Sequence, residues 1–187
     1  MTGLRAEFDA VLVAAQAGAG WAFERLWAAY APAVTGYARL QGAADAEGLA
    51  NEVFFGAFRT ITGFSGDEER FRAWLFTVAH RRIIDERRWT GRRPRTDGAD
   101  PAVLAERVAV PSAEDDALRR AGVERVRALC ACLAPDQEDV LLLRMVGGLT
   151  IEEVAAAVGK SPGAVKALQR RGIATLRRMF EREGVPL

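Results

Sequence analysis

The chain has little cysteine: only two in 187 residues. Cys130 and Cys132 stand two positions apart on a helical stretch, which points their thiols to different sides, and no second ligand pair follows. We therefore expect no zinc site, because structural zinc needs four such ligands. A redox role for the two thiols stays open.

Long apolar segments are also missing. No run of eighteen apolar residues occurs, so we expect no membrane span. Glu7 and Asp9 interrupt the short apolar patch near the start, which does not have the architecture of a signal peptide. We therefore expect a cytoplasmic protein. Aromatic residues make up only 8% of the chain, whereas alanine is abundant, and this composition favours helices.

No catalytic constellation can be assembled from the sequence. It lacks a metal-ligand cluster, a glycine-rich phosphate loop and a Ser/His/Asp set, and the Gly-Ala-Gly at residues 18–20 follows no strand. Asp85 and Glu86 are adjacent, so on a helix they project about 100° apart and suit pairing with neighbouring arginines better than acid–base chemistry. We predict no enzyme activity, no cofactor and no bound metal.

The charge of the chain is unevenly distributed, although the net charge is only +1. Residues 81–95 carry a local charge of +5 and residues 160–182 one of +6, while residues 96–121 carry −3. Two basic segments separated by an acidic one indicate two contacts with nucleic acid joined by a spacer. His80 borders the first basic segment, so we expect it to be structural or close to DNA rather than catalytic.

Residues 149–171 predict two short helices joined by a tight turn. Thr150 and Glu153 form a capping box at the start of the first helix. Gly159 supplies a turn in which φ is positive, and Ser161 caps the second helix. This arrangement is typical of a helix-turn-helix.

The second of these helices has one apolar and one basic side. Val165 and Leu168 face back toward the first helix, which leaves Lys166, Arg170 and Arg171 on the outside. Such a helix suits the major groove of DNA. The alternative is a plain helical hairpin whose charged face is only solvated.

Helical patterns also cover residues 6–95 and predict one all-α domain. The expected helices lie at residues 6–17, from Phe23 to Tyr37 with Pro32 a candidate kink, from Asp45 to Ile61, and from Phe71 to Trp89, with a loop at residues 64–70. Phe55 interrupts a polar face: it is either a partner contact or, with Phe54, part of a core enclosed on two sides. Trp74 shares the apolar face of Phe71 and is expected in the core.

The rest of the chain predicts a linker and a second domain. Residues 96–112 contain Pro, Asp and Ala and indicate a flexible linker. Residues 113–184 form a second all-α domain that includes the helix-turn-helix. The predicted fold class is all-α, with two helical domains joined by a flexible linker.

Together these motifs resemble the extracytoplasmic-function sigma factors of bacterial RNA polymerase over almost the whole chain. Four segments carry the resemblance in the order of that family: FERLWAAYAPAVTGYA, DAEGLANEVFFGAFRTITGF, GDEERFRAWLFTVAHRRIIDERRWTGRRP and LAPDQEDVLLLRMVGGLTIEEVAAAVGKSPGAVKALQRRGIATLRR. The family commonly has an acid where this chain has Gly48.

The resemblance implies three sets of contact residues. Contacts with the β′ clamp of core RNA polymerase are expected from Asp45, Glu47, Asn51, Glu52 and Phe55. Contacts with the promoter −10 element, including a loop that traps a melted base, are expected from Phe64, Ser65, Gly66, Asp67, Arg81, Arg82, Asp85 and Arg88. Contacts with the −35 element are expected from Lys160, Ser161, Gly163, Ala164, Lys166, Ala167, Arg170 and Arg171.

The resemblance also implies a function and its partners. We expect promoter-specific transcription initiation, with core RNA polymerase bound at its β′ clamp and β flap, promoter DNA, and an anti-sigma factor as partners. A stand-alone helix-turn-helix repressor or activator is the alternative, but it leaves the arginine-rich Trp89 helix and the Asp45 face without a role. An adaptor that binds only proteins is a further alternative.

Overall fold

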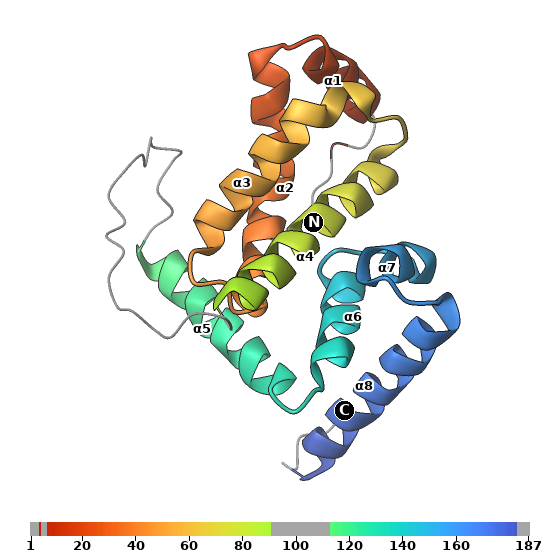
Figure 1. Cartoon of the computed structure of the whole chain (residues 1–187). Coiled ribbons are helices and arrows are strands. Elements are labelled where there is room, and N and C mark those ends of the chain that lie inside the picture. The colour runs from red at the N-terminus through yellow and green to blue at the C-terminus, as the bar shows by residue number, and fades with distance from the viewer. Residues whose placement is uncertain (1–3, 5–6, 91–112, 183–187) are drawn as a thin grey trace.

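The computed structural model describes residues 4, 7–90 and 113–182, and within them all regular structure is helical (Figure 1). The elements are α1 (Phe8–Gln16), α2 (Gly20–Leu40), α3 (Ala46–Thr60), the short 3₁₀ helix η2 (Ile61–Gly63), α4 (Glu68–Thr90), α5 (Ala113–Cys130), α6 (Pro135–Met145), α7 (Ile151–Val158) and α8 (Pro162–Arg182). The predicted all-α fold class is confirmed. The predicted linker at residues 96–112 lies outside the described residues.

Helices α1 to α4 form an N-terminal bundle, in which α2 lies against α1 and α3, and α3 lies against α4. Helix α2 continues through Pro32 to Leu40. The core is rich in aromatic rings: Phe71 lies 5.5 Å from both Phe8 and Tyr30, centroid to centroid. Such tilted pairs stabilise a core beyond the burial of their area.

The start of α4 differs from the prediction. The helix begins at Glu68, so residues 68–70, which were expected in a loop, form its first turn. The reason is Asp67, whose Oδ1 accepts a hydrogen bond from the Arg70 backbone N–H at 2.9 Å, as an N-cap does. Glu68 and Glu69, whose polarity suggested a loop, lie in the first turn of α4. Negative charges there interact favourably with the positive end of the helix dipole.

Helices α6 to α8 form a C-terminal bundle in which each helix contacts the other two. Its core is aliphatic, with Val140, Leu143 and Val165 fully buried. Helix α8 approaches α6 closely at Gly172, where a Cβ atom would lie 2.8 Å from Cδ1 of Leu141. A larger residue at this position would therefore have to displace the Leu141 side chain.

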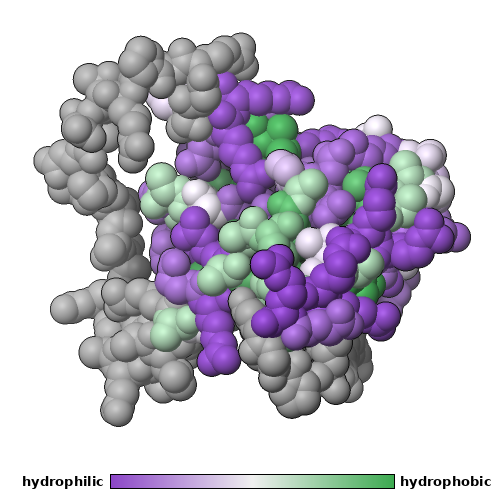
Figure 2. All heavy atoms as spheres, turned by 90° about the horizontal axis from the view of Figure 1, so that it is seen from below, coloured by the Kyte–Doolittle hydropathy of each residue, from purple (hydrophilic) through white to green (hydrophobic). Residues whose placement is uncertain are grey.

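The two bundles contact each other directly. Helix α5, which leads into the C-terminal bundle, contacts α2, and α7 lies against α4 (Figure 1). Three polar side chains are buried where the bundles meet: Gln41 at the end of α2, His80 on α4 and Asp139 on α6. From below, the surface is mostly hydrophilic, with a smaller hydrophobic area (Figure 2). No helix within the described ranges has the length and apolar character that crossing a bilayer requires.

Candidate nucleic-acid interface

The turn between α7 and α8 is held by local caps, as the sequence predicts. Thr150 Oγ1 accepts from the Glu153 N–H at 3.2 Å, and Glu153 Oε2 accepts from the Thr150 N–H at 2.7 Å. Gly159 ends α7 with a φ of 68°, and Ser161 Oγ accepts from the Ala164 N–H at 3.2 Å. These bonds satisfy backbone donors that helix starts leave unpaired, and they set the angle between the two helices.

Helix α8 presents one basic face to solvent. Val165 and Leu168 are buried against the bundle, whereas Lys166, Arg170 and Arg171 are exposed. The remaining predicted −35 residues on this helix and its cap also reach the surface, Ser161 and Gly163 as exposed residues and Ala164 and Ala167 as half-buried ones. The small side chains allow a close approach, and the cations supply attraction to phosphate and guanine.

The basic face extends further along α8 than the predicted set. A shallow hollow of about 380 Å³ follows it, lined by Lys166, Gln169, Arg170, Ile173, Ala174 and Arg177. Ile173 and Arg177 were missed, although the helical spacing of three and seven residues after Arg170 places them on the same face.

Lys160 is oriented away from this face. It is half-buried, and its Nζ lies 2.9 Å from Oδ2 of Asp136 on α6. The structure thus does not bring Lys160 together with Lys166 and Arg170.

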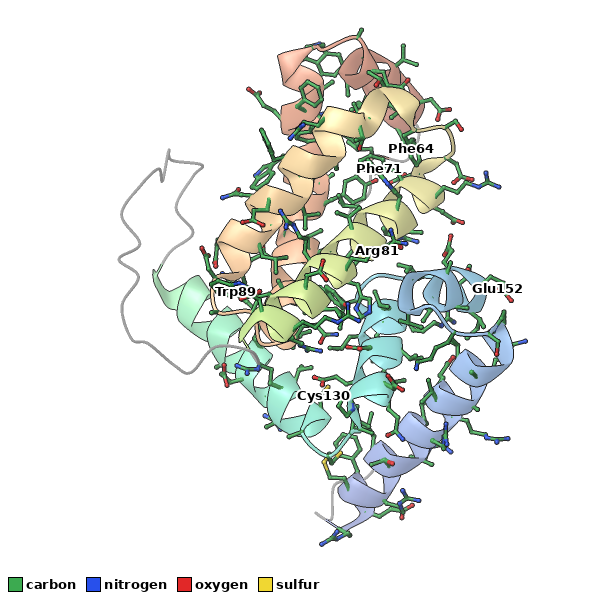
Figure 3. All side chains as sticks on the ribbon, in the orientation of Figure 1. Phe64, Phe71, Arg81, Trp89, Cys130 and Glu152 are labelled. Carbon is green, nitrogen blue, oxygen red and sulfur yellow. The ribbon has the colours of Figure 1, made fainter. Side chains whose placement is uncertain are left out.

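The loop between η2 and α4 is built on an aromatic cluster. The ring of Phe64 lies 5.4 Å from that of Phe71 and 5.3 Å from that of Trp74 (Figure 3). On the other side, Gln16 Nε2 donates to the carbonyl oxygens of Ile61 at 3.0 Å and Phe64 at 2.8 Å. Both contacts fix the backbone of the loop, and nothing in the local sequence around Gln16 signalled its role.

The other predicted loop residues lie at the surface. Ser65 and Asp67 are exposed, and Gly66 is half-buried with a φ of 150°. A Cβ atom at Gly66 would lie 2.9 Å from Cδ of Arg70, so the loop needs glycine here. The half-buried ring of Phe64 and these polar atoms form a small surface on which an unstacked base can rest.

The charged residues predicted on α4 divide between two sides of the helix. Arg82 turns toward α3, where its guanidinium lies 2.9 Å from Oε2 of Glu52. Arg81, Asp85 and Arg88 line a groove between α4 and the C-terminal bundle, and Figure 3 shows Arg81 beside α7. The structure thus joins Arg82 to Glu52, a predicted polymerase contact, rather than to Arg81.

The predicted polymerase contacts on α3 share one exposed face. All five lie at the surface: Asp45, Glu47, Asn51, Glu52 and Phe55. Asp45 Oδ1 accepts from the Gly48 N–H at 2.8 Å and caps the helix. A Cβ atom at Gly48 would collide with the Asp45 carboxyl group, so a larger residue there would displace this side chain from its present position.

The two alternatives for Phe54 and Phe55 are resolved by the structure. Phe54 is buried in the core, whereas Phe55 is 67% exposed. The Arg59 guanidinium lies 5.7 Å from the centroid of the Phe55 ring. An exposed aromatic ring on an acidic helix face is typical of a protein contact.

A groove of about 540 Å³ separates α3 from the end of α4. Its lining includes Glu52, Arg82 and Trp89, and the indole of Trp89 is 58% exposed (Figure 3). The sequence places Trp89 in an arginine-rich helix, but Trp89 is not among the predicted contact residues. Its position in an arginine-rich stretch was the signal that could have marked it as a contact residue.

The remaining candidate groups show no chemistry of their own. Burial raises the pKa of the Cys130 thiol, and the exposed Cys132 Sγ donates to the Leu129 carbonyl at 3.2 Å. His80 Nδ1 lies 3.0 Å from the Tyr37 hydroxyl in the interior. No group of three or more candidate metal ligands occurs in the part of the chain that the structure describes.

Comparison with known proteins matches both bundles to one family. The family model for Sigma-70 region 2 covers residues 26–93, and that for Sigma-70, region 4 covers residues 124–176. The fold is shared with the solved structure of CnrH in complex with the cytosolic domain of CnrY, at a TM-score of 0.66 and 24% identity, over 92% of this chain and 96% of that one.

Curated relatives agree with this assignment. The ECF RNA polymerase sigma factor BldN of Streptomyces coelicolor is 34% identical over 89% of this chain, which spans 63% of the length of BldN. The ECF RNA polymerase sigma factor SigD of Mycobacterium tuberculosis is 33% identical over 90% of this chain and 82% of SigD. The RNA polymerase sigma factor CarQ of Myxococcus xanthus is 34% identical over 87% and 91%. The chain therefore belongs to the sigma-70 family of RNA polymerase sigma factors, within its extracytoplasmic-function group.

Proposed function

We propose that this protein directs core RNA polymerase to a set of promoters by holding the enzyme and reading the −10 and −35 elements. The observation that carries the proposal is the presence, in one chain, of an exposed acidic face with Phe55 on α3 and an open basic face on α8. A repressor needs only the second of these surfaces.

The −35 element is read by α8 in the major groove. Lys166, Arg170 and Arg171 supply contacts with phosphates and guanine edges, while Ser161, Gly163, Ala164 and Ala167 allow close approach. Arg177, on the same face, adds a phosphate contact further along the helix. Lys160 acts through its ion pair with Asp136 by holding the turn.

The −10 element is bound as a melted strand by the loop at residues 64–67 and by α4. Phe64 offers its half-buried ring for stacking, and Ser65, Gly66 and Asp67 offer polar groups around it. Arg81 and Arg88 attract the strand backbone from one groove, which Asp85 also lines, and Arg82 contributes from the groove on the α3 side. Captured bases then stabilise the open promoter, and the chain itself performs no chemical step.

Core polymerase is held through α3 and the C-terminal bundle. The β′ clamp contacts Asp45, Glu47, Asn51, Glu52 and Phe55, whose shared face combines four polar side chains with one apolar ring. The β flap contacts the C-terminal bundle. The protein acts in the cytoplasm, where polymerase and promoter DNA meet.

An anti-sigma factor is the remaining proposed partner. The solved structure that shares this fold contains CnrH bound to the cytosolic domain of a second protein, CnrY. We propose that a protein of this kind withholds the present chain from polymerase until a signal releases it.

Run-off transcription tests the proposal. Purified core polymerase is incubated with genomic fragments, including the protein's own upstream region, with and without the protein. We expect specific transcripts only when the protein is added. Tight binding to duplex DNA without binding to core polymerase and without transcripts would overturn the proposal in favour of a repressor.

The polymerase contact has a matched control. Phe55→Ala removes the exposed ring, and we expect at least a tenfold loss of affinity for core polymerase, the typical cost of about 1.4 kcal/mol or more for an interface anchor. Val13 on α1 is 65% exposed, similar to Phe55, and Val13→Ala should leave the affinity unchanged. Equal losses in a pull-down titration would contradict the assignment of α3.

A further inference from the structure

The loop proposed to capture a base, at residues 64–67, is bonded to α1 at the point where the loop begins. Gln16 is the last residue of α1, and its Nε2 donates to the carbonyl oxygens of Ile61 at 3.0 Å and Phe64 at 2.8 Å. A primary amide has two N–H groups, so both of its donors are engaged with the loop. The Ile61 carbonyl also accepts from the Phe64 N–H at 3.0 Å. The backbone therefore enters the loop through a turn that is bonded twice.

The other end of the loop is bonded to the chain just before α1. Glu68, the first residue of α4, directly follows the loop. Its Oε1 accepts from the Leu4 backbone N–H at 2.7 Å and from the Tyr30 hydroxyl of α2 at 2.8 Å. Leu4 precedes α1 and Gln16 ends it, so groups from the two ends of one helix hold the two ends of one loop.

Helix α1 also supports the aromatic ring of the loop. Phe8 on α1 is buried, and its ring lies 5.5 Å from that of Phe71, centroid to centroid. The ring of Phe71 in turn lies 5.4 Å from that of Phe64, and Figure 3 shows these two side chains next to each other. Val11 and Ala15, which are also buried, fix α1 to the bundle. The position of α1 therefore reaches Phe64 by two routes, through ring contacts and through the Gln16 amide.

The packing of α1 alone does not require a polar residue at its end. Four apolar side chains already bury the helix against the bundle, those of Phe8, Val11, Leu12 and Ala15. Gln16 is half-buried, and its amide satisfies loop carbonyls that would lose their partner if the side chain were apolar. What the amide determines is therefore the shape of the loop backbone, from which the half-buried ring of Phe64 is presented.

We propose that α1 is a brace for strand capture and that Gln16 is its positioning residue, which contacts no DNA but sets the angle at which Phe64 meets an unstacked base. Loss of the Gln16 amide should reduce the contribution of one base of the −10 strand, rather than the affinity for promoter DNA as a whole. This inference rests on the proposed function for the capture of a base, whereas the shape of the loop is a property of the protein without polymerase.

Two substitutions of Gln16 test the brace. Gln16→Glu keeps the size of the side chain, but an ionised carboxylate has no N–H to donate to the two carbonyls. Gln16→Leu removes all polar atoms. The control is Arg25→Met, which removes the exposed ion pair between Arg25 on α2 and Glu7 at the start of α1, away from the loop. Gln16→Glu and Arg25→Met each make the net charge more negative by one, so any general loss of attraction to DNA is the same in both.

Two measurements are needed. Hydrogen–deuterium exchange of the protein alone reports the loop, and we expect the Phe64 N–H to exchange about fivefold faster in both Gln16 variants and at an unchanged rate in Arg25→Met. Binding of the holoenzyme is then measured on the promoter found by run-off transcription, with the −10 strand unpaired and each of its bases replaced in turn by an abasic site. One abasic site should lower the affinity of the unaltered holoenzyme about fivefold or more, and that of the Gln16 variants about twofold or less.

The outcomes separate the brace from the proposed function. Unchanged exchange of the Phe64 N–H in the Gln16 variants would overturn the brace, and faster exchange with an unchanged abasic penalty would overturn its role in capture. If no abasic site lowers the affinity of the unaltered holoenzyme, the proposed capture of a base fails together with this role of Gln16, while the exchange rates still report the contact itself. The use of two variants guards against misfolding of one, which the far-ultraviolet circular dichroism spectrum reveals.

Discussion

The N-terminal and C-terminal bundles, each of which we propose presents side chains to DNA, are built in different ways. Aromatic rings, among them Phe8, Tyr30 and Phe71, fill the first core, whereas aliphatic side chains such as Val140 and Leu143 fill the second. The first bundle thereby shapes a loop and two grooves. The second holds one helix at a fixed angle.

The two bundles also differ in whether their basic surface residues form ion pairs. In the N-terminal bundle Arg82 is paired with Glu52, and Arg88 with Asp85. Among the described residues, no ion pair involves Lys166 or Arg170 on α8. The surface proposed for melted DNA is thus partly neutralised by its own acidic residues, whereas the surface proposed for duplex DNA keeps its full attraction for phosphate.

The largest expected effect is the loss of stability when one buried side chain is truncated in each of the two cores. Phe71→Ala removes the ring at the centre of the aromatic cluster and should lower the free energy of unfolding by about 3–5 kcal/mol. Leu143→Ala, equally buried in the C-terminal bundle, should cost about 2–5 kcal/mol. Only the first should also displace the Phe64 loop. Urea unfolding measures both values; a loss below about 1 kcal/mol for Phe71→Ala would contradict the role of the cluster.

A smaller effect is expected for the open face of α8. Lys166→Ala combined with Arg170→Ala removes two direct DNA contacts, each worth about 1–3 kcal/mol, and should reduce −35-dependent transcription at least tenfold. Binding to core polymerase should stay the same. The control is Arg178→Ala combined with Arg182→Ala, which removes the same charge from a different side of α8. Loss of polymerase binding in the first variant would mean that this helix has another role.

The smallest effect is a pH dependence of the contact between the bundles. Burial lowers the pKa of His80, Arg87 and Arg81 lower it further, and Asp139 opposes them. The Tyr37 hydroxyl lies 3.0 Å from His80 Nδ1, and Gln41 donates a hydrogen bond to that hydroxyl. His80 therefore binds a proton more weakly when the two bundles are in contact than when they are apart. In the separated arrangement its pKa would lie near the ordinary 6.5. The contact between the bundles should be independent of pH above 6.5 and should weaken as the pH falls below 6.5.

The measurement is the radius of gyration between pH 7.5 and pH 6.0. Burial raises the pKa of Glu138, so acidification acts at that carboxyl in the opposite direction. The His80→Gln variant separates the two effects, because it should remove the opening that acidification causes. An identical pH profile in His80→Gln would exclude the histidine as the titrating group.

Sequence reasoning succeeded where the signals were local. The helix-turn-helix depends on bonds between residues three apart, such as Thr150 with Glu153, so its caps could be predicted residue by residue. The start of α4 was misplaced because Asp67 was read as part of a loop and not as a cap. The predicted all-α class followed from periodicity, which is also a local property.

Contacts between distant segments could not be predicted. Asp139 follows no pattern that would mark it as a partner of Gln41, and Arg82 gave no sign that it would pair with Glu52 on α3. The predicted site residues therefore lie on the expected helices, but the structure divides those of α4 between two grooves. Which residues share a groove depends on how whole helices pack against one another. The helical periodicity of a sequence does not contain this information.

The amide of Gln16 has a consequence for how the −10 loop gains affinity. Gln16 lies in α1, before the segment matched to Sigma-70 region 2, yet it holds the carbonyl groups of Ile61 and Phe64. A loop that is ordered before binding loses less conformational entropy when a base arrives. We therefore expect a change at Gln16 to alter the order of this loop, and with it the proposed capture of a melted base, while every side chain proposed to contact DNA stays the same.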